Sequence, residues 1–205
     1  MMERERSNVR SRTDRRWART TEVRETLLAA ALTVFLERGY SEASIADIVQ
    51  RSGSSVGSVY HHFGGKPEMF VALWQGYETS ATAAAGDAVA EARRSGQAGP
   101  TDLFLIGARA YLEFSWSRHE EAQLFSSGDA PPGFDLVSGR DGREWIRQNS
   151  ILLDADASET KERITVAILT AVIDAGAREV SLLESRDEAF ESIDVTLGFV
   201  RRAMT

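Results

Sequence analysis

The chain has 205 residues, of which 42% are hydrophobic and 27% charged, a composition typical of a folded globular protein with a sizeable core. It contains no cysteine, which excludes disulfides and thiolate metal sites. No apolar run approaches the roughly 18 residues of a membrane span, and no apolar stretch follows the charged first residues as in a secretion signal. We therefore expect a cytoplasmic protein without a membrane partner.

The net charge of −7 is distributed unevenly along the sequence. Residues 1–66 hold 11 Lys and Arg against 8 Asp and Glu, whereas residues 67–205 hold 13 against 23. A phosphate-binding surface needs local positive charge, so the first third of the chain is a candidate for nucleic-acid binding. Seven arginines precede Thr20. We expect residues 1–19 to form a flexible arm that is either simply solvated or contacts DNA phosphates or the minor groove.

Helical periodicity begins after this arm, and no strand signal stands out anywhere in the chain. Leu28, Leu32 and Phe35 fall on one helical stripe, and Gly39 can supply the left-handed cap that ends the helix. Ser44 and Asp47 have the spacing of a capping box, which predicts that a second helix begins there.

Two short helices separated by a Ser/Gly turn follow. Gly53 is expected to end the helix that starts at Ser44, and Ser55 to cap another that runs to about His62. This spacing suits a helix-turn-helix, whose second helix can lie in the major groove of DNA. The alternative is a helical hairpin in which Tyr60 and Phe63 are ordinary core residues.

The rest of the chain also reads as helical. Gly64-Gly65 breaks the chain before Lys66-Pro67 opens a fourth helix. A helix is expected over about 101–117, followed by a shorter helix and a loop at 128–135. Three more helices are expected over about 141–153, 157–183 and 187–203. The sequence therefore predicts an all-α fold with a three-helix helix-turn-helix domain over 20–68 and a larger helical domain over 69–205.

Residues 21–74 resemble the tetracycline-repressor (TetR) type of transcriptional regulators. The resemblance lies in G-Y at 39–40, S-I-A-D-I at 44–48, S-G-S-S-V-G-S-V-Y-H-H-F at 52–63 and Lys66. Two positions depart from the family pattern: Ser54 replaces an aliphatic residue, and Gly64-Gly65 replaces a more polar pair.

The resemblance implies a role for each matching residue. It implies that Val56, Gly57, Ser58 and His61 face base edges, that Ser44, Tyr60, His62 and Lys66 contact phosphates, and that Phe63 packs inside the domain. The Ser55 hydroxyl and the free N–H groups at the start of the same helix can also donate to phosphate oxygens.

The resemblance further implies that the C-terminal domain binds a small-molecule inducer and forms a homodimer. Aromatic residues could line the pocket, although each one alone is more often ordinary core. The candidates are Phe104, Tyr111, Phe114, Trp116, His119, Phe125 and Trp145. The last two helices carry an Ala167, Ala171, Ala175 series and an apolar Phe190–Val200 stripe, which pack either within one subunit or across a two-fold axis.

We therefore expect a ligand-responsive repressor that binds a palindromic DNA operator as a homodimer, with no cofactor, no metal and no enzymatic activity. One alternative is a DNA-binding protein that responds to no ligand. Another is a serine hydrolase, because Gly53-x-Ser55-x-Gly57 matches a nucleophile elbow, but that motif needs a preceding strand. His61 and His62 are adjacent on a helix and point about 100° apart, which makes them poor metal chelators.

Overall fold

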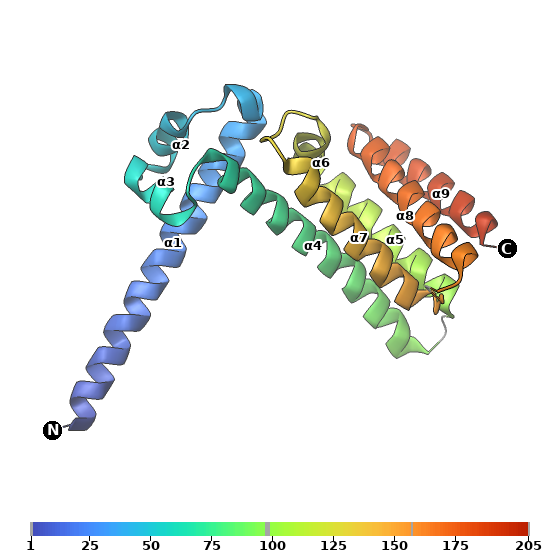
Figure 1. The fold of residues 1–205 in the computed structure, drawn as a ribbon, viewed down its shortest axis with the longest axis horizontal. Helices are drawn as coiled ribbons and strands as arrows, with labels where there is room; N and C mark the ends of the chain where they lie inside the picture. The colour runs from blue at the N-terminus through green and yellow to red at the C-terminus, as the bar shows by residue number, and fades with distance from the viewer. Residues whose placement is uncertain (1, 97–98, 157, 205) are drawn as a thin grey trace. The chain divides into compact units, whose positions relative to one another are not determined.

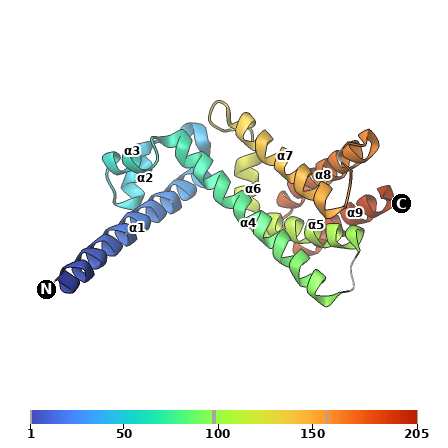
Figure 2. The ribbon, with the colours of Figure 1, turned by 60° about the horizontal axis from the view of Figure 1, so that its bottom comes forward.

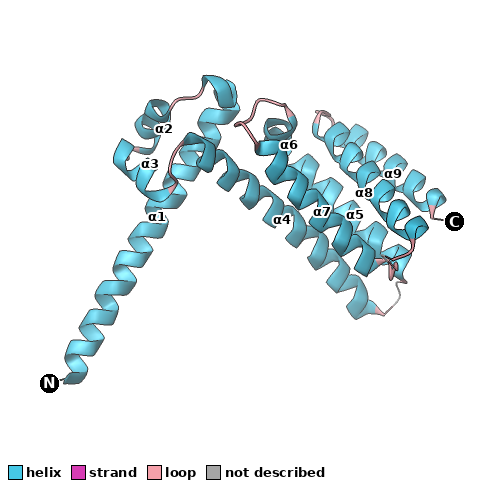
Figure 3. Cartoon of the chain, viewed as in Figure 1, coloured by secondary structure: helices cyan, strands magenta, loops and turns pink. Residues whose placement is uncertain are grey.

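A computed structural model describes residues 2–96, 99–156 and 158–204, without the side chains of residues 2–19 and 141. Every regular element of these residues is a helix (Figure 3). None of the helices described is long and apolar enough to cross a membrane. The chain divides into two compact units, Met1–Leu73 and Trp74–Thr205, and the division falls within one helix.

The first unit contains α1 (Met2–Glu42), α2 (Ile45–Ser52), α3 (Val56–His62) and the start of α4 (Lys66–Ser95) (Figure 1). The backbone of residues 2–19, predicted as a flexible arm, continues α1. The contacts predicted for its arginines lie outside the described side chains. Helix α1 is interrupted at Gly39, whose φ of 77° lies in the region that favours glycine.

A small aromatic and aliphatic core holds the first unit together. Phe35 is buried with Tyr40 and Phe70, and the three ring centroids lie 5.2 to 5.8 Å apart. Ile48 of α2 and Val59 of α3 are both fully buried. Each short helix therefore buries one apolar face, and α2 packs against both α1 and α3.

The second unit contains the rest of α4 and five further helices. They are α5 (Pro100–Ser117), α6 (His119–Ser126), α7 (Phe134–Leu152), α8 (Thr160–Ser181) and α9 (Arg186–Ala203). Helices α5, α8 and α9 pack side by side around a core that includes Phe104, Leu112 and Ile193 (Figures 1 and 2). Gly176 permits the close approach of α8 to α9, because a Cβ there would lie 2.8 Å from Thr196 Cγ2.

The structure corrects one expectation for the second unit, and it shows the packing of one apolar stripe for which the sequence left two alternatives. Helix α7 begins at Phe134 and not near residue 141, because Phe134 is buried against Trp74, with ring centroids 5.4 Å apart, and this packing overrides two glycines nearby. On α9, most of the Phe190–Val200 stripe belongs to the core of the subunit, since Ile193, Leu197 and Val200 are buried.

Candidate nucleic-acid interface and ligand cavity

A complete capping box starts α2. Ser44 Oγ accepts from the Asp47 N–H at 3.2 Å, and Asp47 Oδ2 accepts from the Ser44 N–H at 3.1 Å. The hydrogen bonds from Ser44 and the nearby charge of Arg38 hold the pKa of Asp47 below its ordinary value, although partial burial opposes them. Ser44 itself is exposed at the helix start, where a phosphate oxygen could approach it.

The turn between α2 and α3 depends on one left-handed residue and one serine cap. Gly53 has a φ of 65°, which ends α2, and the Ser54 N–H donates to Ser52 Oγ. Ser55 then begins α3, and its Oγ accepts from the Ser58 N–H at 3.1 Å. These bonds fix the direction in which α3 leaves the turn.

Helix α3 has a clear inner and outer face. Val59 is fully buried, whereas Val56 is 49% and Tyr60 56% exposed. Gly57 and His61 are exposed on the same side as Val56 and Tyr60, as the helical period requires. Ser58 and His62 are half-buried. The structure thus brings the predicted base-facing residues onto one outward surface, apart from Ser58 at its edge.

Lys66 is engaged inside the first unit. Its Nζ donates to the carbonyl oxygens of Tyr40 at 2.7 Å and Ala43 at 2.8 Å, with Ser41 O at 3.4 Å, and it lies 4.3 Å from the centre of the Tyr40 ring. An ammonium group has three protons to donate, so these carbonyls occupy all of them. This geometry favours a role in holding the end of α1 to α4 over the phosphate contact predicted from the sequence.

Other cations of the first unit are also paired. Arg38 forms an ion pair with Asp47, Arg51 with Glu37, and the Arg24 guanidinium lies 5.1 Å from the centre of the Phe63 ring. Phe63 is half-buried, as expected of a residue that packs inside the domain.

Ser55 lies in a setting unlike a hydrolase nucleophile. The element before it is the helix α2, not the strand that a nucleophile elbow requires, and its Oγ serves as a helix cap. Within the described part of the chain, no group of three or more His, Cys, Asp or Glu side chains could hold a metal ion.

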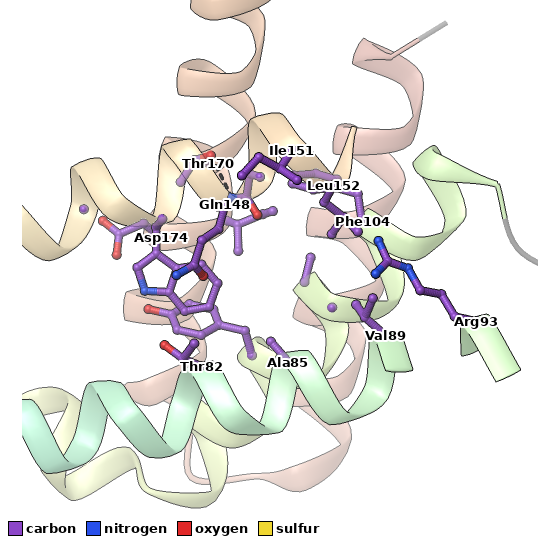
Figure 4. Close-up of a pocket in the computed structure, with 18 residues that line it drawn as sticks. Thr82, Ala85, Val89, Arg93, Phe104, Gln148, Ile151, Leu152, Thr170 and Asp174 are labelled. Atoms are coloured by element: carbon purple, nitrogen blue, oxygen red, sulfur yellow. Dashed lines mark hydrogen bonds between the residues drawn. The ribbon is translucent and has the colours of Figure 1, made fainter. Parts of the chain in front are cut away.

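A cavity of about 340 Å³ lies in the second unit between α4, α5, α7 and α8 (Figure 4). Its wall is mainly apolar, with Val89, Phe104 and Leu152 among the residues that line it. A neighbouring cavity of about 510 Å³ shares Tyr111 and Trp145 with it. The volumes and the few polar groups are typical of small-molecule sites.

The predicted ligand residues separate into two groups. Phe104, Tyr111 and Trp145 line the first cavity, and Phe125 lines the second. The Trp145 ring lies 5.2 Å from that of Tyr111, and its Nε1 donates to Glu78 Oε2 at 3.2 Å.

Phe114, Trp116 and His119 line neither of these two cavities. Phe114 packs against Tyr77, with ring centroids 5.3 Å apart, and Trp116 packs edge-on against Phe190 at 5.9 Å. The His119 ring is exposed and its Nδ1 lies 3.1 Å from Trp116 O.

Six polar residues that line the first cavity were not predicted from the sequence: Thr82, Arg93, Gln148, Asn149, Thr170 and Asp174. No local pattern distinguishes them, because polar residues occur on every helix surface, and only their convergence on one cavity sets them apart.

Comparison with known proteins agrees with this arrangement. A sequence model of bacterial regulatory proteins of the tetR family matches residues 27–73. The transcriptional repressor AcnR of Corynebacterium glutamicum is 38% identical over 53 residues, which are 26% of this chain and 28% of AcnR. The transcriptional activator FasR of Mycolicibacterium smegmatis is 43% identical over 54 residues, 26% of this chain and 25% of FasR. The chain thus spans only about a quarter of the length of these relatives.

Similarity to solved structures extends over nearly the whole chain. A putative TetR-family transcriptional regulator from Syntrophomonas wolfei superposes with a TM-score of 0.72 at 15% identity, covering 90% of this chain and 96% of that one. At this identity the likeness shows a shared fold. The N-terminal domain of this chain, over residues 27–73, therefore belongs to the tetR family of bacterial regulatory proteins.

Proposed function

We propose that this protein is a ligand-responsive transcriptional repressor that binds a palindromic operator as a homodimer. The observation that carries the proposal is the outward face of α3, which follows a capped turn inside the segment that the family model matches. Val56, Gly57, Ser58 and His61 are proposed to read base edges, and Ser44, Ser55, Tyr60 and His62 to contact phosphates.

A two-fold assembly is supported by an apolar face on the last two helices. Ile168 on α8 is 56% and Phe199 on α9 52% exposed, and Ile164 and Val195 are exposed nearby on the same helices. Ala171 and Ala175 continue the exposed side of α8 and allow close helix approach. We propose that this face, which we call the α8/α9 face, pairs with its copy in a second subunit.

The dimer gives the short reading helix enough specificity. One helix of the length of α3 contacts few bases, whereas two such helices about 34–36 Å apart reach successive turns of the major groove. A ligand in the second unit would favour a state whose reading helices no longer match this spacing. Helix α4 contains Lys66 and also the cavity residues Thr82 and Val89, so it is the proposed route of coupling.

The DNA part of the proposal is tested by footprinting the full chain on the DNA that flanks its own gene. We expect two protected half-sites one helical turn apart, and reporter expression that rises when the gene for this protein is deleted. Falling expression would instead identify an activator, as FasR is named.

Variants of α3 sharpen this test. Ser58→Ala and His61→Ala should change which operator bases are preferred, because each removes a group proposed to read a base edge. Ser117→Ala, which removes an exposed serine of the second unit, is the matched control and should leave the preference unchanged. An unaltered preference in both α3 variants would contradict base readout by these residues.

A further inference from the structure

Asn149 is a buried amide in the mostly apolar wall of the first cavity. The residue is 9% exposed, and its Nδ2 donates to Thr170 Oγ1 at 3.0 Å. Among the residues that the structure describes, its side chain makes no other hydrogen bond. The Asn149 Oδ1 atom has no donor among the described residues and is not sealed off from the cavity, so it can accept a hydrogen bond from a molecule there.

Thr170 determines which atom of the amide is left for the cavity. The Thr170 hydroxyl donates its only proton to Val166 O at 2.8 Å, and can therefore only accept from Asn149. The amide must present its nitrogen to Thr170, as in the dashed contact of Figure 4. Because each hydrogen bond in this series has a fixed donor, the orientation of the Asn149 amide is also fixed. Its Oδ1 is therefore the atom left as an acceptor.

Among the side chains that the structure describes, the charged residues that line this cavity are Arg93 and Asp174. Figure 4 shows Arg93 and Asp174 on opposite sides, with Val89, Phe104 and Leu152 nearer to Arg93. Both charged residues are exposed, and Asp174 is paired with Arg178. An ionised ligand group beside Asn149 would lose its hydration without meeting an opposite charge, which disfavours it strongly.

The size of the cavity and a second polar group narrow the ligand further. At about 340 Å³ the cavity is more than twice the roughly 150 Å³ of a cavity that holds benzene, which suits a molecule of two fused rings. Tyr111 also lines the cavity, and its hydroxyl makes no hydrogen bond within the described residues. Burial and the charges of Glu78 and Asp174 raise its pKa, so at neutral pH it remains a donor.

We infer that the cavity selects an uncharged, mostly apolar molecule of about two-ring size that donates a hydrogen bond to Asn149 Oδ1. The inference rests on the proposed function, because it names the chemical class of the ligand in the proposed regulatory cavity. Asn149 is the specificity residue, and Thr170 is the positioning residue that orients its amide.

Three probes of similar shape test the inference by titration calorimetry with the full chain. The probes are 2-naphthol, which is an uncharged donor, 2-methoxynaphthalene, which cannot donate, and 2-naphthoate, which is an anion at neutral pH. We expect 2-naphthol to bind about threefold to tenfold more tightly than 2-methoxynaphthalene, the worth of one neutral hydrogen bond, and 2-naphthoate to bind most weakly.

Substitutions in the cavity wall test whether Asn149 causes the preference for 2-naphthol over 2-methoxynaphthalene. Asn149→Leu should make the affinities for 2-naphthol and 2-methoxynaphthalene equal, and Thr170→Val should reduce their ratio. Val89→Ala is the matched control, because it shortens the apolar wall and should change both affinities while keeping the ratio. Circular dichroism checks that each variant is folded, and the three-probe series on the unmodified chain decides the question even if Asn149→Leu does not fold.

Three outcomes overturn the inference: equal affinity for the two uncharged probes, tightest binding of 2-naphthoate, or binding of no probe. A selectivity that survives in folded Asn149→Leu also overturns it. Failure of the proposed function is a separate result, since it appears as a lack of operator binding by the unmodified chain in a mobility-shift assay without any probe.

Discussion

The two compact units of this protein differ in how far apart in the sequence the residues lie that build their candidate sites. In the first unit, the hydrogen bonds that start α2 and α3 join residues three apart, Ser44 to Asp47 and Ser55 to Ser58. In the second unit, the cavity wall joins residues as distant in sequence as Thr82 and Asp174. A surface built from local caps can be recognised in a sequence, whereas a cavity built from distant helices emerges only from their packing.

The largest expected effect concerns the α8/α9 face, which no short motif specifies. Ile168→Glu combined with Phe199→Glu should dissociate the proposed dimer, because it places charges in an apolar contact. Operator affinity should then fall about a hundredfold or more, since each half-site would be bound alone. Light scattering coupled to gel filtration measures the first effect and a mobility-shift assay the second.

Leu136→Glu is the control for this experiment. Leu136 is an exposed leucine of α7, outside the α8/α9 face, and its substitution should leave both measurements unchanged. An unmodified chain that is monomeric at the concentrations used for operator binding would contradict the proposed interface.

An effect of intermediate size on stability is expected at Lys66, where the first unit, like the second, depends on a contact between residues distant in the sequence. Lys66→Ala should lower the free energy of unfolding by about 1–3 kcal/mol, because it leaves the carbonyls of Tyr40 and Ala43 without their donor. The dependence of operator affinity on salt should keep its slope. Lys161→Ala removes the other lysine, in the second unit, and is the matched control. A slope reduced by about 1 with unchanged stability would place Lys66 on a phosphate instead.

The smallest effect concerns the local cap at Ser44. The hydrogen bonds from Ser44 keep the pKa of Asp47 below its ordinary value of 3.8, so their stabilising effect is complete above that pH and is lost as the pH falls through the lowered pKa. Ser44→Ala should therefore lower the melting temperature at pH 7, and the difference from the unmodified chain should shrink towards pH 2.

The control for this measurement is Ser126→Ala, because the Ser126 hydroxyl donates to the backbone carbonyls of Ala122 and Gln123 and not to a carboxylate. Its effect on the melting temperature should not vary with the protonation of Asp47. A Ser44→Ala difference that is constant across this pH range would contradict the coupling between the two residues.

Much of the first unit was predictable because its helix limits have local physical causes. The ends of α2 and α3 follow from Ser44, Gly53 and Ser55, each of which acts on backbone groups within one turn of itself. The outward position of Val56 and Tyr60 then follows from the helical period once Val59 is buried. For Lys66, the sequence pattern predicts a phosphate contact, whereas the structure shows a hydrogen bond to Tyr40 O. That bond joins residues 26 positions apart, so no local pattern indicates it.

The sequence by itself determined the all-helical fold and the helix-turn-helix, because caps, glycines and apolar periodicity act over a few residues. Only the tertiary structure decided which apolar stripe of α9 enters the core, that Phe134 begins α7, and that Tyr111 and Trp145 line a cavity while Trp116 does not. The same holds for Asn149, whose free oxygen is defined by Thr170 on another helix. Burial and hydrogen-bond satisfaction depend on neighbours that the chain brings together only when it folds.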